Sequence, residues 1–292
     1  MSILSASSIA SLCLHETKWF HIQLHQTEHR IDLISKWAVD LHGAKVLELG
    51  CGQGDCTAVL AEAVGSEGHV TAVDPASLDY GSPYTLGQAQ SHLSSGRLGS
   101  RITWKQASPL TFLEESTETY DVAVLAHCLW YFSSPEVIAQ TLRLLAARAK
   151  KVCIAEWSLS TSTPGAQAHL LAVLTQASLE CRKTETTSNV RTVVAPVRIK
   201  ELAASAGLVL DHEGLVTPGE GVRDGGWEAG TVVSKAFEAE VQESVKDERE
   251  RSVVLALRDA TVTSVAKLGG AKNVMPMDVW AGVLSVAGAT SS

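Results

Sequence analysis

Three glycines at alternate positions and one acid are the residues whose types and spacing most clearly indicate chemistry in this chain. Gly50, Gly52 and Gly54 follow a short apolar run, and Asp74 comes 20 residues after the last glycine. Glycines at such a bend let the backbone approach a nucleotide-like ligand closely, and an acid at the end of the next strand can bind ribose hydroxyls. The spacing therefore predicts a cofactor site.

The elements that must position these residues lie on both sides of the glycines. Residues 45–49 are short and apolar enough for a central parallel strand. Residues 57–64 are expected to form a helix, and residues 69–75 a second, β-branched strand that Pro75 stops. Strand, glycine loop, helix, strand and acid make a βαβ unit in the order that a nucleotide site requires.

Two carboxylates narrow the kind of cofactor. The nicotinamide fingerprint needs Gly or Ala where Asp55 stands, and a carboxylate at a helix start would repel a pyrophosphate. Glu48, inside the first strand, would instead favour a ligand that carries an ammonium and a sulfonium. A nucleoside without phosphates is therefore expected, and a nicotinamide-dependent dehydrogenase is the less favoured alternative.

The run from Glu48 to Gly54 resembles the first motif of the class I S-adenosylmethionine-dependent methyltransferases, and the resemblance spans roughly residues 45–157. It implies that S-adenosylmethionine is the cofactor, with the loop backbone on its methionine part and Asp74 on its ribose. The residues expected to bind it are Glu48, Gly50, Cys51, Gly52, Gly54, Asp74, Pro75, Ala107, Ser108 and His127.

Two later motifs depart from the family pattern. After a third strand at residues 101–106, the family commonly places an Asp that binds the adenine amino group, and here Ser108 or the backbone of Ala107 must serve. After a fourth strand at residues 120–126, relatives often carry two histidines where this chain has Trp130 and Tyr131. His127 is therefore the candidate proton acceptor, and a buried structural histidine is the alternative.

The remaining pattern predicts an α/β fold. A helix at about 135–149 precedes a fifth strand at 151–157, and a helix at 199–207 precedes a strand that starts at Leu208. Alternating strands and helices indicate a doubly wound, mostly parallel sheet. The resemblance implies seven strands in a Rossmann-like arrangement, the last at residues 231–233, in an antiparallel hairpin.

Three additions surround this core. Residues 1–42 are expected to form an N-terminal helical cap, residues 43–235 the cofactor domain with an insertion at 159–191, and residues 236–292 a helical extension with a helix in 279–286. The insertion reads equally as a substrate lid or an extra core helix. In the helix expected at residues 17–41, the apolar stripe would be Phe20, Leu24, Ile31, Ile34, Ala38 and Leu41.

On the other side of that helix, His21, His25 and His29 recur at intervals of four. A metal site is one interpretation, but no further ligands converge on the spacing, so a solvated or cleft-facing helix edge is favoured.

Composition bounds the function further. The net charge is −8, from 24 basic and 32 acidic residues without a basic run, which disfavours nucleic acid. No apolar stretch reaches membrane-spanning length, and six cysteines without a Cys-x-x-Cys pair indicate a reduced, cytoplasmic protein.

The default acceptor is therefore a small organic molecule, methylated without a metal and contacted by Trp130, Tyr131 and Trp157. A relative that keeps the cofactor fold without methylating is the alternative.

Overall fold

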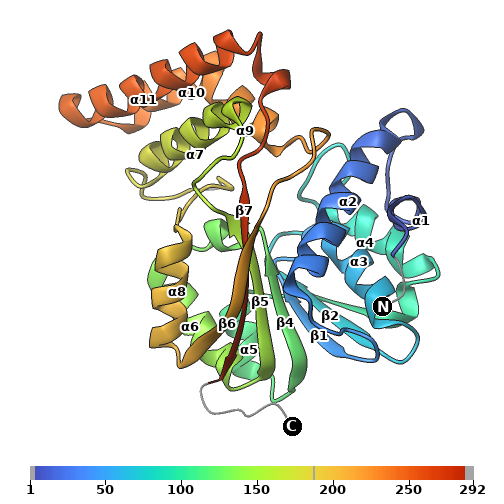
Figure 1. The fold of residues 1–292 in the computed structure, drawn as a ribbon. Helices are drawn as coiled ribbons and strands as arrows, with labels where there is room; N and C mark the ends of the chain where they lie inside the picture. The colour runs from blue at the N-terminus through green and yellow to red at the C-terminus, as the bar shows by residue number, and fades with distance from the viewer. Residues whose placement is uncertain (1–3, 187, 287–292) are drawn as a thin grey trace.

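The structure is a computed structural model that describes residues 4–186 and 188–286. Its centre is a seven-stranded sheet with the order β3-β2-β1-β4-β5-β7-β6 (Figure 1). The first five strands are parallel, and β7 runs antiparallel to both β5 and β6. The strands are β1 (Lys45–Leu49), β2 (His69–Asp74), β3 (Ile102–Gln106), β4 (Tyr120–Ala126), β5 (Ala149–Trp157), β6 (Leu208–Val216) and β7 (Val279–Val286).

The central strand β1 determines where a ligand can bind. It pairs with β2 on one side and with β4 on the other, and its last four residues are buried. The chain proceeds outward from β1 to β2 and β3, then returns to β4. Because the loops after β1 and β4 lead to opposite faces of the sheet, they separate at this switch point, which is where doubly wound sheets bind ligands.

Helices cover both faces of the sheet (Figure 1). On one face, α2 packs against α1 and α3 and reaches β6 and β7, and on the other α6 packs against α5 and α8. These layers, with α4 beside α3, comprise α1 (Ala6–Ala10), α2 (Phe20–Trp37), α3 (Asp55–Val64), α4 (Leu86–Ser95), α5 (Pro109–Glu115), α6 (Pro135–Ala146) and α8 (Pro196–Ser205).

Four helices form a separate layer beyond one end of the sheet, which we call the cap (Figure 1). They have their own apolar cluster, which includes Ala172 of the first helix, Phe237 and Val254. They are α7 (Gln167–Glu180), α9 (Asp224–Val233), α10 (Lys235–Ser244) and α11 (Glu248–Lys267). Within the described residues, no helix combines the length and apolar character needed to cross a membrane.

The predicted doubly wound sheet is confirmed, but its last strand was placed wrongly. Residues 231–233 belong to helix α9, and residues 279–286 form strand β7 where a helix was expected. A strand buried on both faces has a continuous apolar run without a period of two, so its pattern resembles that of a buried helix. The boundary expected at residue 235 is wrong as well, because it separates β7 from the sheet.

Candidate functional site

The glycine loop, residues 50–54, joins β1 to α3 at the switch point. All three of its glycines have positive φ: +76° at Gly50, +52° at Gly52 and +98° at Gly54. A Cβ on Gly50 would lie 2.5 Å from the Cβ of Cys128, whereas a Cβ on Gly52 would meet nothing within 4 Å. The absence of a side chain at Gly50 therefore lets the loop pack closely against Cys128, whereas Gly52 borders open space.

Asp74 lies beside this open position, as the spacing predicted. Its Oδ2 accepts the Gly52 N–H at 2.8 Å, and its Oδ1 accepts the Ala76 N–H at 2.9 Å. The Gly50 N–H also donates to the Val73 carbonyl at 2.8 Å. The end of β2 thus fixes the loop after β1, so the glycines and the acid form one structural unit.

Glu48 lies behind the loop and is fully buried. Its Oε2 accepts the hydroxyl of Thr57 at 2.5 Å. Burial raises the pKa of Glu48 to about 7, against the opposing effects of the Thr57 hydrogen bond and, more weakly, the Arg30 charge. Near pH 7 this carboxyl is therefore easily ionised by a cation placed close to it.

Helix α2 covers the loop from the other side. Gln23 donates to the Asp55 carboxylate at 2.8 Å. The buried side of the helix includes Gln26, Thr27 and His29, whereas much of the apolar stripe predicted for this side is part-exposed. The stripe prediction holds for Ile34 and Leu41, which are buried in the core, and is wrong for the others, because this side of α2 also faces polar groups at the strand ends. Its part-exposed or exposed members are Phe20, Leu24, Ile31 and Ala38.

Four other residues were predicted to bind the cofactor: Cys51 within the loop, and Pro75, Ala107 and Ser108 outside it. Cys51 is buried, and burial raises the pKa of its thiol, while Pro75 is exposed after Asp74. The Ala107 N–H donates to the Asp74 carbonyl at 3.1 Å and so extends the pairing of β2 and β3, while the adenine contact at Ala107 stays a prediction. Ser108 caps α5, accepting the Thr111 N–H at 3.1 Å.

His127, the predicted proton acceptor, lies in a group that we call the histidine cluster: His29, His127, Glu156, Trp157 and His169. The Nε2 atoms of His29 and His127 are 3.0 Å apart, within hydrogen-bond distance. The Nδ1 of His127 lies 3.7 Å from Oε1 of Glu156. Segments far apart in the sequence, from α2, the ends of β4 and β5, and α7, thus meet beyond the strand ends.

Aromatic contacts hold the cluster together. The centroid of the Trp157 ring lies 4.4 Å from that of His127 and 4.9 Å from that of His169, which it meets edge-on. The planes of the Trp157 and His29 rings are parallel within 10°. His127 also has a φ of +53°, which is uncommon for a residue with a Cβ. Such strain persists where the surroundings fix a side chain, so it marks His127 as a functional candidate.

Several polar atoms in the histidine cluster and in the adjacent part of α2 have no hydrogen-bond partner. Within the described residues, six buried side-chain nitrogen or oxygen atoms have no hydrogen-bond partner. Five of them are Gln26 Oε1, His29 Nδ1, Arg30 Nη1, His127 Nδ1 and His169 Nε2. An unpaired buried polar atom costs about 1–3 kcal/mol, so their concentration indicates a place that receives a polar ligand.

The predicted acceptor contacts have different surroundings. Trp130 is 3% exposed, and its indole N–H donates to the Val194 carbonyl. Trp130 is therefore a packing residue, because residues 191–194 fold over it and leave it no free surface. Tyr131 is 47% exposed, yet desolvation, assisted by the Glu228 charge, raises the pKa of its phenol. Trp157 lies inside the histidine cluster, as described above.

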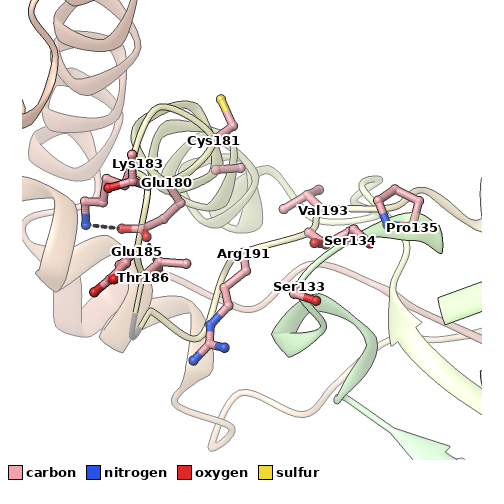
Figure 2. Close-up of a pocket in the computed structure, with 13 residues that line it drawn as sticks. Ser133, Ser134, Pro135, Glu180, Cys181, Lys183, Glu185, Thr186, Arg191 and Val193 are labelled. Carbon is pink, nitrogen blue, oxygen red and sulfur yellow. Dashed lines mark hydrogen bonds and ion pairs between the residues drawn. The ribbon is translucent and has the colours of Figure 1, made fainter. Parts of the chain in front are cut away.

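A cavity lies away from these residues (Figure 2). It has a volume of about 730 Å³ and lies between Ser133, Pro135, the end of α7 near Cys181, and Arg191. Lys183 pairs there with Glu180 at 2.6 Å. None of the residues predicted for the cofactor or the acceptor lines this cavity, so the site is defined by the unpaired polar atoms and the open side of Gly52.

The three histidines of α2 do not form a metal site. His21 is exposed, His25 contacts Glu28 at 3.0 Å, and His29 is buried against His127. Among the residues that the structure describes, no three His, Cys, Asp or Glu side chains are grouped to hold a metal ion. The edge of the helix is thus solvated at His21 and buried at His29.

The sequence analysis gave no functional role to four residues near the site: Arg30, Glu156, His169 and Asp224. Glu156 accepts the Leu129 and Trp157 N–H groups at 3.0 Å each, and Asp224 accepts from Gln26 at 2.9 Å. An acid in a buried apolar strand and a histidine in an apolar helix are signals for Glu156 and His169. Arg30 and Asp224 gave no such signal, because only the fold brings them to the site.

Comparison with known proteins finds methyltransferases. A family model described as a methyltransferase domain matches residues 46–150. The methyltransferase phomM′ of Diaporthe leptostromiformis is 33% identical over 283 residues, which cover 82% of this chain and 72% of that protein.

Solved structures agree on the fold. The cyclopropane-fatty-acyl-phospholipid synthase-like protein of Lactobacillus casei superposes with a TM-score of 0.84 at 32% identity, over 96% of this chain and 98% of that chain. The [4+2]-cyclase SpnF superposes with a TM-score of 0.52 at 14% identity, over 89% of this chain and 80% of that one, a likeness of fold alone.

Proposed function

Because the chain belongs to the class I S-adenosylmethionine-dependent methyltransferases, with S-adenosylmethionine as cofactor, we propose that it methylates a nucleophilic atom of a small organic molecule without a metal. The observation that carries this proposal is the geometry of two adjoining parts. The glycine loop offers an open side at Gly52 next to the Asp74 carboxylate, and the histidine cluster offers unpaired polar atoms.

The residues at the loop fit the cofactor. Arg30 has a buried guanidinium nitrogen without a partner among the described residues, which suits the methionine carboxylate. Glu48 suits the ammonium and sulfonium charges, and Asp74 retains lone pairs for ribose hydroxyls. The bound cofactor supplies an electrophilic methyl group, and the protein aligns the acceptor with it.

The histidine cluster supports a small acceptor. It is formed by largely buried side chains from α2, the strand ends and the cap helix α7, and the carboxylates of Asp224 and Glu228 on α9 accept from Gln26 and Gln176. A polymer would need an extended surface of complementary charge, and the chain is acidic overall. Metal independence is part of the proposal because, among the described residues, no three His, Cys, Asp or Glu side chains are grouped so that they could share a metal ion.

We also propose that the chain has three parts. They are the N-terminal helices, the sheet domain, and a C-terminal segment whose helices belong to the cap of α7 and α9 to α11. The cytoplasm is the proposed location, because all six cysteines are free thiols and five are buried.

The test has two steps. Calorimetric titration with S-adenosylmethionine and S-adenosylhomocysteine measures cofactor binding, and a screen of metabolite extracts with a labelled methyl donor then seeks a product. We expect binding and a labelled small molecule. Absence of binding would contradict the cofactor site. Binding without methyl transfer to any extract would instead favour a relative that keeps the fold for another purpose.

A further inference from the structure

We infer that His29, on helix α2, is the general base of the reaction, and that His127 and Glu156 position it and receive its charge. This inference rests on the proposed function. It changes the role that the sequence suggested for His127, and it follows from where the protons in the cluster must lie.

Glu156 determines which ring nitrogen of His127 carries the proton. Its two carboxylate oxygens accept the backbone N–H groups of Leu129 and Trp157, so it is held as an acceptor. The Nδ1 of His127 lies 3.7 Å from Oε1, which is too far for a hydrogen bond, so the carboxylate acts on this nitrogen through its negative charge. A neutral imidazole carries one proton, and the carboxylate favours it on the nitrogen that faces it. His127 therefore has its proton on Nδ1 and a lone pair on Nε2.

The position of the proton on His29 follows from that on His127. The two Nε2 atoms are 3.0 Å apart, and a hydrogen bond between them needs one donor. Since His127 offers a lone pair there, His29 must donate its Nε2–H. Burial first, and then the Arg30 and His127 charges, lower the pKa of His29 well below its usual value, which keeps it neutral. Its Nδ1 then carries a lone pair without a partner among the described residues.

The other histidine of the cluster cannot take this role. His169 accepts the Met277 N–H on Nδ1 at 2.9 Å, so in its neutral form it carries its proton on Nε2 and acts as a donor. Burial lowers its pKa as well. Of the three histidines, only His29 thus presents an unshared lone pair.

The arrangement also explains how a buried histidine with a lowered pKa can accept a proton. With S-adenosylmethionine bound, an acceptor atom X that carries a hydrogen would form the new bond to the methyl carbon with its lone pair, and the electrons of the carbon–sulfur bond would stay on sulfur. The X–H proton passes to His29 Nδ1, and the His29 Nε2 proton passes to His127 Nε2. The positive charge then resides on His127, beside Glu156. The acceptor class is accordingly a hydroxyl, thiol or N–H group that must lose a proton.

The charged and titratable groups around the pair come from every neighbouring element. Besides burial, the charges of Arg30 on α2 and of His127 at the end of β4 lower the pKa of His29. Glu156 on β5 faces His127. Besides burial, the charge of Asp224 on α9 raises the pKa of His169 on α7, and that of His127 lowers it. A titration of the pair must therefore be resolved residue by residue.

Nitrogen-15 NMR of the histidine-labelled full chain tests the proton positions directly. We expect an Nε2–H tautomer for His29 that persists below pH 6, an Nδ1–H tautomer for His127, and one proton coupled to both Nε2 atoms. That coupling identifies the pair even if a variant fails to fold. His29→Gln and His127→Gln assign the signals, and His21→Gln, on the same helix but exposed, is the matched control. A proton on His29 Nδ1, or on His127 Nε2, would overturn the inference.

Positioning by Glu156 is tested in the same spectra. Glu156→Gln removes the charge that faces His127, so we expect its Nδ1–H tautomer to lose population. Unchanged tautomer populations would contradict the positioning role.

Kinetics give a second readout with the acceptor that the labelled-methyl screen identifies. His29→Gln should lower kcat at least about 100-fold without changing the affinity for S-adenosylmethionine, and His21→Gln should match the wild type. Unchanged kcat in His29→Gln would overturn the role of His29 as a base. Failure of S-adenosylhomocysteine to bind the wild type would instead contradict the proposed function, because the tautomers are measured without a ligand.

Discussion

The glycine loop and the histidine cluster adjoin one another, yet they are built in different ways. The loop is held by backbone N–H groups that donate to Val73 and Asp74, and its residues are close in sequence. The cluster is built from side chains of α2, β4, β5 and α7, and several of their polar atoms lack partners among the described residues. A site made of backbone suits a ligand that does not vary, whereas a site made of side chains can change with its acceptor.

The largest effect should follow from blocking the loop. In Gly52→Arg, the side chain would project into the space that is open beside the loop, at a φ of +52° that already disfavours it. We expect binding of S-adenosylmethionine to be lost by calorimetry, more than about 100-fold. Gly207→Arg is the matched control, since Gly207 also has positive φ (+83°) and open surroundings but lies between α8 and β6. Retained binding in Gly52→Arg would mean that the cofactor lies elsewhere.

Removal of the loop's acid should have the next largest effect. Asp74→Ala loses both the ribose contact and the acceptor for the Gly52 N–H, and we expect affinity for S-adenosylmethionine to fall about 10- to 100-fold. Asp74→Asn, which keeps one carbonyl oxygen, should lose less. Unchanged affinity in Asp74→Ala would remove the ribose assignment.

Proton linkage at Glu48 should give a smaller effect. Its pKa is raised to about 7 by burial, so the folded protein holds an extra proton from about pH 4.5 to 7, and this group's contribution to stability falls as pH rises through that window. A cation binds the ionised form better, so affinity for S-adenosylmethionine should rise about tenfold from pH 6 to 8. Calorimetry in buffers of different ionisation enthalpy would detect the released proton.

Glu48→Gln is the control for this linkage. Without an ionisable group at residue 48, affinity should be flat over that range. An equally steep pH dependence in Glu48→Gln would assign the linkage to another residue.

The smallest effect is expected in the part that binds the acceptor. Tyr131→Phe removes only the hydroxyl of a residue that is 47% exposed, so the KM for the acceptor should rise about two- to tenfold, while affinity for S-adenosylmethionine stays unchanged. A change in cofactor affinity equal to the change in KM would show that the two parts are not separable as we describe them. Steady-state kinetics and calorimetry on one preparation make this comparison.

This difference in construction also explains what the sequence could predict. β1, the glycines and Asp74 form a local unit, so their spacing predicted both the fold and the loop. β7 was missed because the helices α9 to α11 separate it from β6 and because its apolar run has no period. His29 and Glu156 meet at His127 only through tertiary packing, so no spacing could join them.

The strands β5, β6 and β7 have a mechanical consequence for the cap. The cap helices follow β5 and β6 along the chain and precede β7, and Val279 pairs with both Trp157 and Val216. The cap is thus anchored through three adjacent strands at one level, and Trp157 is part of that anchorage. A tilt of the cap would move the indole against which His29 and His127 rest. Admission of an acceptor and alignment of the base are therefore expected to be coupled through a single tryptophan.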